Sequence, residues 1–397
     1  MVVFGAVVGL AMALLHGYLW WRLVRGTTRP GRTRRVLTAV TVVLAVLPTV
    51  AVVFRGQLPM AVATPLAWVA YSWLGLAFYL LLATMVTEPV RGALRLFRYS
   101  SAAADAGQAD AERGIVSRRR LFALAAGAVG VGVAGTGAVL ANSAPVVRRV
   151  PIRIPGLDPS LAGLRIVTFS DGHLSATYGG RRFERVVETV NAQRPDVVAI
   201  VGDLVDGEVD QLREDAAPLA DLVSDQGVFF VTGNHEYFVD TAAWLRHLPT
   251  LGIDVLRNER VPIRRGSASF DLAGIDDRTA AASGVPGHGA DLDAALDGRD
   301  DATALVLLAH QPVQVDQARA AGVDLQLSGH THGGQLWPFD HAVRLDQPVV
   351  EGWSQQGDTQ LYVTAGAGYW GPPMRVGARP EVTVVELQPG QPVRPPR

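Results

Sequence analysis

Long apolar segments in the first 141 residues set the strongest limit on the fold. Residues 2–23, 36–54 and 60–86 form three such runs, and a fourth ends near Ala141. Each run can form a helix that crosses the hydrocarbon core of a bilayer, which takes about 20 residues. Because the runs are long, free of acidic residues and bracketed by arginine, they favour membrane spans over buried helices of a soluble domain.

Arginine clusters give these spans a direction. Six arginines lie between residues 22 and 35, three follow the third run, and residues 118–120 precede the fourth. The positive-inside rule places these clusters in the cytoplasm. The N-terminus, the 55–59 link and everything after Ala141 would then lie outside, so the second half of the chain would face the extracytoplasmic side of the cytoplasmic membrane.

Residues 117–122, Ser-Arg-Arg-Arg-Leu-Phe, also resemble a twin-arginine export signal, since a Gly- and Ala-rich apolar segment follows them. That route carries folded proteins and would suit a domain that binds metal before export. The alternative is that these arginines only anchor the topology. Asn142, Ser143 and Ala144 could permit cleavage, or the fourth run could remain as a span.

Charge and cysteine content narrow the function of the second half. Residues 146–397 contain 22 arginines and 33 acids, a net charge of about −11, which argues against a nucleic-acid partner. The chain has no cysteine, so disulfides and thiolate metal sites are excluded. Any metal would have to be held by His, Asp, Glu or Asn.

The second half alternates short apolar, β-rich segments with helical patterns, which predicts an α/β fold. Ligands in such folds gather at the carboxyl ends of the strands. The strands are expected at residues 165–169, 196–201, 228–232, 269–274, 304–309, 324–327, 361–364 and 381–386. Helices are expected at residues 181–192, 209–224, 241–251 and 312–321.

Polar motifs follow five of these strands directly, and they hold five of the nine histidines. They are Asp171-Gly172-His173, Gly202-Asp203, Gly233-Asn234-His235-Glu236, His310 and Gly329-His330-Thr331-His332. A single Asp or Asn at a strand end usually caps a helix or makes a turn. Five motifs that each close a strand indicate a common metal site instead.

This ordered set resembles the calcineurin-like metallophosphoesterase family over about residues 164–387. The likeness extends to membrane-associated and twin-arginine-exported bacterial phosphoesterases, through the Gly-Ala-Gly-Tyr-Trp-Gly-Pro-Pro-Met-Arg segment at 366–375 and Arg379-Pro380-Glu381. The resemblance implies a β-sandwich flanked by helices, with αββα layers. It also implies hydrolysis of a phosphoester by a metal-activated hydroxide.

The resemblance further implies two divalent metal ions, with Asp203 bridging them. One ion would be held by Asp171, His173 and His332, and the other by Asn234, His310 and His330. Imidazoles combined with hard oxygens suit Mn, Fe or Zn better than Mg or Ca. Two such ions can activate a hydroxide and stabilise the phosphate oxygens.

Other residues of these motifs have roles away from the metals. His235 would protonate the leaving alkoxide or stabilise charge on the phosphoryl group, and the resemblance implies that Asp206 orients this histidine. Glu236 matches its motif without an assigned metal contact and could support the loop. Arg375 and Tyr369 could either recognise substrate or stabilise a turn. The motif glycines, including Gly172, allow tight turns.

These predictions divide the chain into six segments. They are three transmembrane helices at 1–99, a cytoplasmic connector with the Arg-rich motif at 100–120, a fourth span or signal at 121–141, a linker at 142–163, the metallophosphoesterase domain at 164–387 and a disordered tail at 388–397.

We expect a membrane-anchored, di-metal phosphoesterase that acts outside the cytoplasmic membrane. Its tether to the bilayer favours a lipid or cell-envelope phosphoester, and a phosphodiester in particular. A non-catalytic, metal-binding sensory module is the alternative, although such a module would not need both His235 and Asp206. Transport is disfavoured because the apolar runs contain no acid. The sequence leaves the natural substrate, the choice between monoester and diester, and the oligomeric state open.

Overall fold

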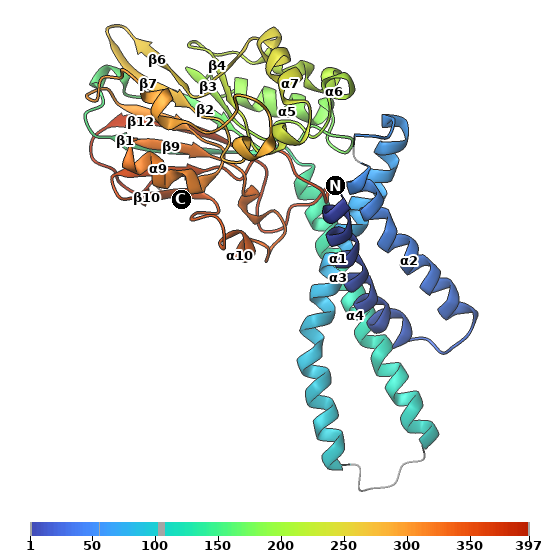
Figure 1. Cartoon of the computed structure of the whole chain (residues 1–397). Helices are drawn as coiled ribbons and strands as arrows, with labels where there is room; N and C mark the ends of the chain where they lie inside the picture. Colours follow the sequence, from blue (N-terminus) through green and yellow to red (C-terminus); the bar gives the residue numbers. More distant parts are fainter. Residues whose placement is uncertain (1, 55, 102–107, 396–397) are drawn as a thin grey trace. The chain divides into compact units, whose positions relative to one another are not determined.

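The computed structural model describes residues 2–54, 56–101 and 108–395 (Figure 1). The chain divides into two compact units. One comprises Met1–Val139 with Gly371–Met374, and the other comprises Leu140–Trp370 with Arg375–Arg397.

The first unit is helical. Its elements are α1 (Val2–Leu19) with the π-helical turn η1 (Trp20–Arg25), α2 (Arg32–Val53), α3 (Met60–Ser101) and α4 (Gln108–Ala141). Four segments are long and apolar enough to cross a membrane: Gly5–Arg25, Arg32–Val53, Met60–Pro89 and Arg119–Ala141. The predicted helical membrane region is confirmed as four candidate spans.

The connector expected at 100–120 is largely helical. Helix α3 continues to Ser101 and α4 begins at Gln108, while residues 102–107 lie outside the described residues. The Arg-rich motif at 117–122 therefore belongs to the same continuous helix as the fourth candidate span.

The third candidate span reaches Pro89 and so includes one acidic residue, Glu88, beyond the apolar run expected from the sequence. Arg22 forms an ion pair with this carboxylate, and the hydroxyl of Tyr18 donates to it over 3.4 Å. The pairing joins the first span to the third. It offsets the cost of a charge inside an apolar helix.

The second unit contains two six-stranded sheets. The first has the order β1 (Val146–Ile154), β12 (Glu381–Pro389), β2 (Arg165–Phe169), β3 (Val197–Val201), β4 (Val228–Val231), β5 (Ile253–Val255). The second has the order β10 (Gly352–Gln356), β11 (Thr359–Val363), β9 (Leu325–Ser328), β8 (Leu305–Leu308), β7 (Ala268–Gly274), β6 (Glu259–Arg265). In each sheet four consecutive strands are parallel: β2 to β5 in the first, and β11, β9, β8, β7 in the second.

The core lies between the two sheets. Successive side chains of a strand point to opposite faces, so alternate residues of β3, Val197, Ala199 and Val201, join the core shared with the second sheet. Val198 and Ile200 are also buried, on the opposite, helix-covered face. Helices α5 (Gly180–Asn191), α6 (Val209–Ala216) and α7 (Thr241–His247) lie on one side, and α8 (Leu292–Leu296) and α9 (Val315–Ala320) belong to the other (Figure 1). The expected sandwich of two sheets between helices is confirmed.

Two expected boundaries shift. The linker expected at 142–163 contains β1, which pairs with β12 in parallel from Val146↔Glu381 onward. Pro151 is compatible with this strand because β1 is at the edge of the sheet. The tail expected at 388–397 contributes its first two residues to β12, and residues 396–397 lie outside the described part of the chain.

Candidate metal centre

The predicted metal ligands all follow the carboxyl ends of parallel strands. Asp171 and His173 follow β2, Asp203 follows β3, Asn234 follows β4, His310 follows β8, and His330 and His332 follow β9. Five of these residues have positive φ angles: Asp171 (53°), His173 (46°), Asp203 (51°), His330 (72°) and His332 (52°). Non-glycine residues rarely adopt this conformation, and its concentration here is typical of a functional site.

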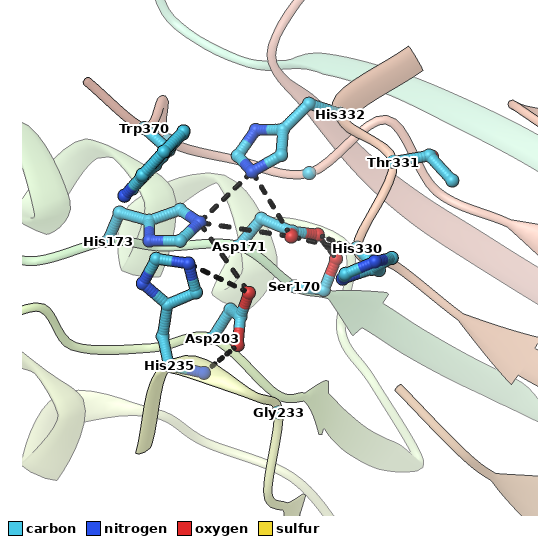
Figure 2. Close-up of polar contacts among 12 residues, drawn as sticks. Ser170, Asp171, His173, Asp203, Gly233, His235, His330, Thr331, His332 and Trp370 are labelled. Atoms are coloured by element: carbon cyan, nitrogen blue, oxygen red, sulfur yellow. Dashed lines mark hydrogen bonds and ion pairs between the residues drawn. The ribbon is translucent and has the colours of Figure 1, made fainter. Parts of the chain in front are cut away.

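Three residues make up the first group of potential ligands. His332 Nε2 lies 3.0 Å from His173 Nε2 and 3.3 Å from Asp171 Oδ1. All three residues are buried, and Figure 2 shows their side chains converging. Their ligand atoms lie within 4.8 Å of one another, which is close enough for a single ion to bind all three.

A second group contains Asp203, which also lies near His173 of the first group. Asp203 Oδ2 lies 3.1 Å from His310 Nε2 and 3.9 Å from His173 Nε2, and His330 completes the group with His310 and Asp203. His310 Nδ1 donates a hydrogen bond to the Val201 carbonyl over 2.8 Å. That bond fixes the ring orientation and leaves Nε2 as the metal-facing nitrogen, a common arrangement for a ligating histidine.

The side chain of Asn234 has an oxygen that could serve as a metal ligand. Its Oδ1 is buried and accepts no hydrogen bond from the described residues. A buried carbonyl oxygen without a partner is costly, and native proteins rarely leave one. A metal ion would satisfy this oxygen, so Asn234 fits the metal set.

Burial sets the charge of the histidines. Desolvation by burial, followed by the nearby His310, lowers the pKa of His330 to about 3. Burial, followed by the nearby His173, also lowers the pKa of His332 well below its usual value. Burial opposes protonation of His310 as well, but Asp203 and Asp171 raise its pKa well above the usual value. His330 and His332 are therefore neutral, as metal binding requires.

His235 lies beside both groups. Its Nδ1 is 2.5 Å from Asp206 Oδ1, and its Nε2 is 3.9 Å from Asp203 Oδ2. Its backbone N–H also donates to Asp203 Oδ1 over 2.8 Å. The imidazole of His235 thus lies between the Asp206 carboxylate on one side and the two groups of candidate metal ligands on the other. Its role as a proton donor stays a prediction.

Glu236 is fully buried and holds two ligand loops together. Its Oε1 accepts from the backbone N–H groups of Leu204 and Val205, over 2.8 and 3.3 Å. Its Oε2 accepts from those of Asp203 and Gly233, over 3.0 and 2.7 Å. Burial, together with the negative charge of Asp203, raises the pKa of Glu236 to about 7. The residue connects the loops that follow β3 and β4.

Arg375 and Tyr369 are both buried, which favours the structural role over substrate recognition. The guanidinium of Arg375 donates to the carbonyls of Ala365, Gly366, Gly368 and His332, with distances of 2.6 to 3.1 Å. Tyr369 donates its hydroxyl proton to the Thr177 carbonyl over 2.6 Å. Arg375 thereby shapes the loop beneath His332.

Sequence reasoning missed two aromatic residues at this site. Phe238 and Trp370 pack edge-on against His235, with ring centroids 5.1 and 5.6 Å from it. Phe238 follows His235 by three residues, a proximity that is visible in the sequence. Trp370 is distant in sequence, and only the fold brings it here (Figure 2).

Comparisons with known proteins identify the family of the chain. The model of the family described as "Calcineurin-like phosphoesterase" matches residues 164–334. A "Transmembrane protein with metallophosphoesterase domain" from Danio rerio is 42% identical, and the alignment covers 64% of this chain and 59% of that protein. A protein of the same description from Bos taurus is 38% identical, with 81% and 73% covered. An uncharacterized metallophosphoesterase from Bacillus subtilis is 32% identical, with 57% and 79% covered. The chain belongs to the calcineurin-like phosphoesterase family of metal-dependent phosphoric ester hydrolases.

Proposed function

We propose that the second unit is a di-metal phosphoesterase. One observation carries this proposal: Asp203 lies between the two groups of ligands, with its Oδ2 3.1 Å from His310 Nε2 of the second group and 3.9 Å from His173 Nε2 of the first. A shared carboxylate holds two ions close together, as two-metal hydrolases require. The partnerless Oδ1 of Asn234 supports a ligand at the second position.

The donor set selects the metal. Neutral imidazoles with carboxylate and amide oxygens suit Mn, Fe or Zn. When bound, the ions supply an activated water and offset the negative charge of the phosphoryl oxygens. The surrounding residues fix the orientation of the ligands and of His235.

His235 is assigned to the leaving group. His235 Nδ1 lies 2.5 Å from Asp206 Oδ1, so the Nδ1 proton points at this carboxylate. The Nε2 of a protonated ring then faces Asp203 and the candidate metal ligands. A proton delivered from Nε2 to the departing alkoxide would prevent a high-energy anion from forming. Asp206 stabilises the protonated ring and fixes its orientation. The 2.5 Å pairing also disfavours a purely sensory module, which has no need of a positioned proton donor.

We place this chemistry outside the cytoplasmic membrane, on the arginine distribution described above, and we propose the twin-arginine route for export. A reporter enzyme fused after Arg397 tests the location. Activity restricted to the extracytoplasmic side supports it, and activity restricted to the cytoplasm refutes it. Replacing Arg118 and Arg119 by Lys should abolish export if the motif is a signal, and should leave it unchanged if the arginines only anchor the topology.

The proposed substrate is a lipid or cell-envelope phosphoester, and a phosphodiester in particular. Helix α4 ends at Ala141 and β1 begins at Val146. An extended chain spans at most about 18 Å over that interval. The catalytic unit is therefore tethered close to the end of the fourth candidate span, where membrane-associated esters are concentrated.

Hydrolysis by the full-length chain in detergent tests the enzymatic proposal. The protein would be loaded with Mn, Fe, Co or Zn and assayed on bis-p-nitrophenyl phosphate and p-nitrophenyl phosphate. His235→Ala should keep its metal content and lose about 10²- to 10⁴-fold in kcat. His341→Ala, at an exposed position in α10 (Asp340–Val343), is the matched control. Absence of hydrolysis with every metal would refute the enzyme, and an unaltered His235→Ala rate would remove His235 from the mechanism.

A further inference from the structure

Two exposed aromatic rings flank the proposed proton donor. His235 is 7% exposed, whereas Phe238 and Trp370 are 65% and 50% exposed. Both rings meet the imidazole edge-on, at interplanar angles of 70° and 76°. Scattered exposed apolar residues are ordinary on protein surfaces, but two that enclose one imidazole form a local apolar surface. We call Phe238 and Trp370 the aromatic rim.

The rim is built into the loops that carry the metal ligands. Phe238 ends the short helix η4 (His235–Phe238), which starts at the proton donor itself. The backbone of Trp370 is held on both sides by the Gln335 side chain, which accepts from Trp370 N over 3.0 Å and donates to Trp370 O over 2.8 Å. Gln335 is only three residues beyond His332. The two rings are therefore fixed relative to the metal groups.

The position of the rim determines what it can contact. A leaving group must lie against His235 to receive a proton from it, so it must also lie against the rings on either side. Large aromatic side chains gain most by covering apolar surface, and a charged or strongly hydrated leaving group would gain little there. The rim thus favours substrates whose apolar part lies on the leaving-group side of phosphorus.

We propose that Phe238 and Trp370 select phosphoesters of diacylglycerol-type lipid alcohols. This inference rests on the phosphoesterase function proposed above and specifies its substrate class. The short tether between Ala141 and Val146 supports a substrate in the bilayer, where such lipids are found. Water adds its oxygen to phosphorus, the bond between phosphorus and the lipid oxygen breaks, and His235 protonates that oxygen. Diacylglycerol leaves, and the phosphate-containing part remains as the other product.

Two matched substrate pairs test the proposal with full-length, metal-loaded protein in detergent. Dioctanoyl phosphatidic acid and glycerol 3-phosphate form the monoester pair, and dioctanoyl phosphatidylglycerol and glycerophosphoglycerol form the diester pair. The members of each pair differ only in the two octanoyl chains. We expect kcat/KM to be at least about 10-fold higher for the acylated member of one pair. Dioctanoylglycerol should also inhibit competitively, whereas glycerol should not.

Rim variants separate substrate selection from simple support of His235. Phe238→Ser and Trp370→Ser should each lower kcat/KM about 10-fold more for the acylated substrate than for the non-acylated one, mainly through KM. Val223→Ser, at a 65% exposed apolar position outside the rim, is the matched control and should change neither rate.

Three results would overturn the inference. They are equal rates for both members of each pair, equal losses on both members in the rim variants, and hydrolysis of p-nitrophenyl esters without hydrolysis of either lipid. Failure on every phosphoester, the p-nitrophenyl compounds included, would instead refute the underlying phosphoesterase function.

Discussion

Glu236→Gln tests whether the buried carboxylate of Glu236 holds the metal centre together. Glu236 accepts four backbone N–H bonds, two at each carboxylate oxygen, from the loops that carry Asp203 and Asn234. Glutamine keeps one acceptor oxygen and places an NH₂ donor against the other two N–H groups. The change is therefore nearly isosteric, but it removes two hydrogen bonds and leaves two buried donors without a partner.

The expected cost follows from these two lost bonds. Each hydrogen bond to a charged acceptor contributes about 1.5 to 3 kcal/mol, so well above pH 7, where Glu236 is ionised, the variant should lose about 3 to 6 kcal/mol of unfolding free energy. Whole domains are stable by only about 5 to 15 kcal/mol. A loss of about 3 kcal/mol corresponds to a fall in Tm of about 6 to 12 °C for a unit of this size. Metal affinity should fall as well, since the loops bearing Asp203 and Asn234 would no longer be joined.

Thermal unfolding of the full-length chain in detergent, with metal and with chelator, measures this effect, and elemental analysis gives the metal content. Glu184→Gln, at an exposed position of α5, is the matched control and should leave Tm within about 1 °C. An unchanged Tm and full metal content in Glu236→Gln would show that Glu236 does not join the two loops.

Three further predictions concern the same unit. In metal-free protein, the unfolded chain binds a proton at His330 below pH 6.5, whereas the folded state does so only near pH 3. The contribution of His330 to the unfolding free energy, taken as the difference between the wild type and His330→Asn, should therefore fall by up to about 1.4 kcal/mol per pH unit as pH drops below 6.5. Urea titrations of both proteins at pH 7, 6 and 5 measure this slope. The lysine in Arg375→Lys cannot reproduce the hydrogen bonds that the guanidinium makes to four carbonyls. The variant should therefore lower the unfolding free energy by about 2 to 4 kcal/mol, measured by urea titration. An unchanged midpoint would contradict the structural role of Arg375. Gly368→Ala would place a Cβ 2.1 Å from the Gly172 carbonyl oxygen. The variant should therefore displace the loop after β2 and reduce the metal content of the protein. Full metal retention would argue against this close approach.

The strands that the sequence predicts and those that it misses differ in position. All eight predicted strands are interior strands of the two sheets, and the four missed strands, β1, β5, β6 and β10, are the four edges. Interior parallel strands are buried on both faces and read as continuous apolar runs, as in Val197–Val201. Edge strands have fewer buried positions and tolerate proline, so Pro151 and Pro262 mark β1 and β6 as irregular in sequence although both pair regularly.

The candidate site follows the same physical division. The predicted ligands could be found because each directly follows an interior strand, where the apolar run marks the strand end. The structural role of Arg375 could not be found, because it depends on carbonyls that the chain presents only after folding. Trp370 is missed for a related reason: 135 residues separate it from His235, and no local pattern joins them.

The pairing of β1 with β12 constrains how the catalytic unit can be made. β1 immediately follows the fourth candidate span, yet its partner begins at Glu381, near the end of the chain. During synthesis the first sheet stays incomplete until β12 has left the ribosome, and until then β1 is an unpaired edge. The first sheet therefore cannot be completed before β12 has been made. Truncation before Glu381 would remove the strand between β1 and β2 and leave both open to aggregation.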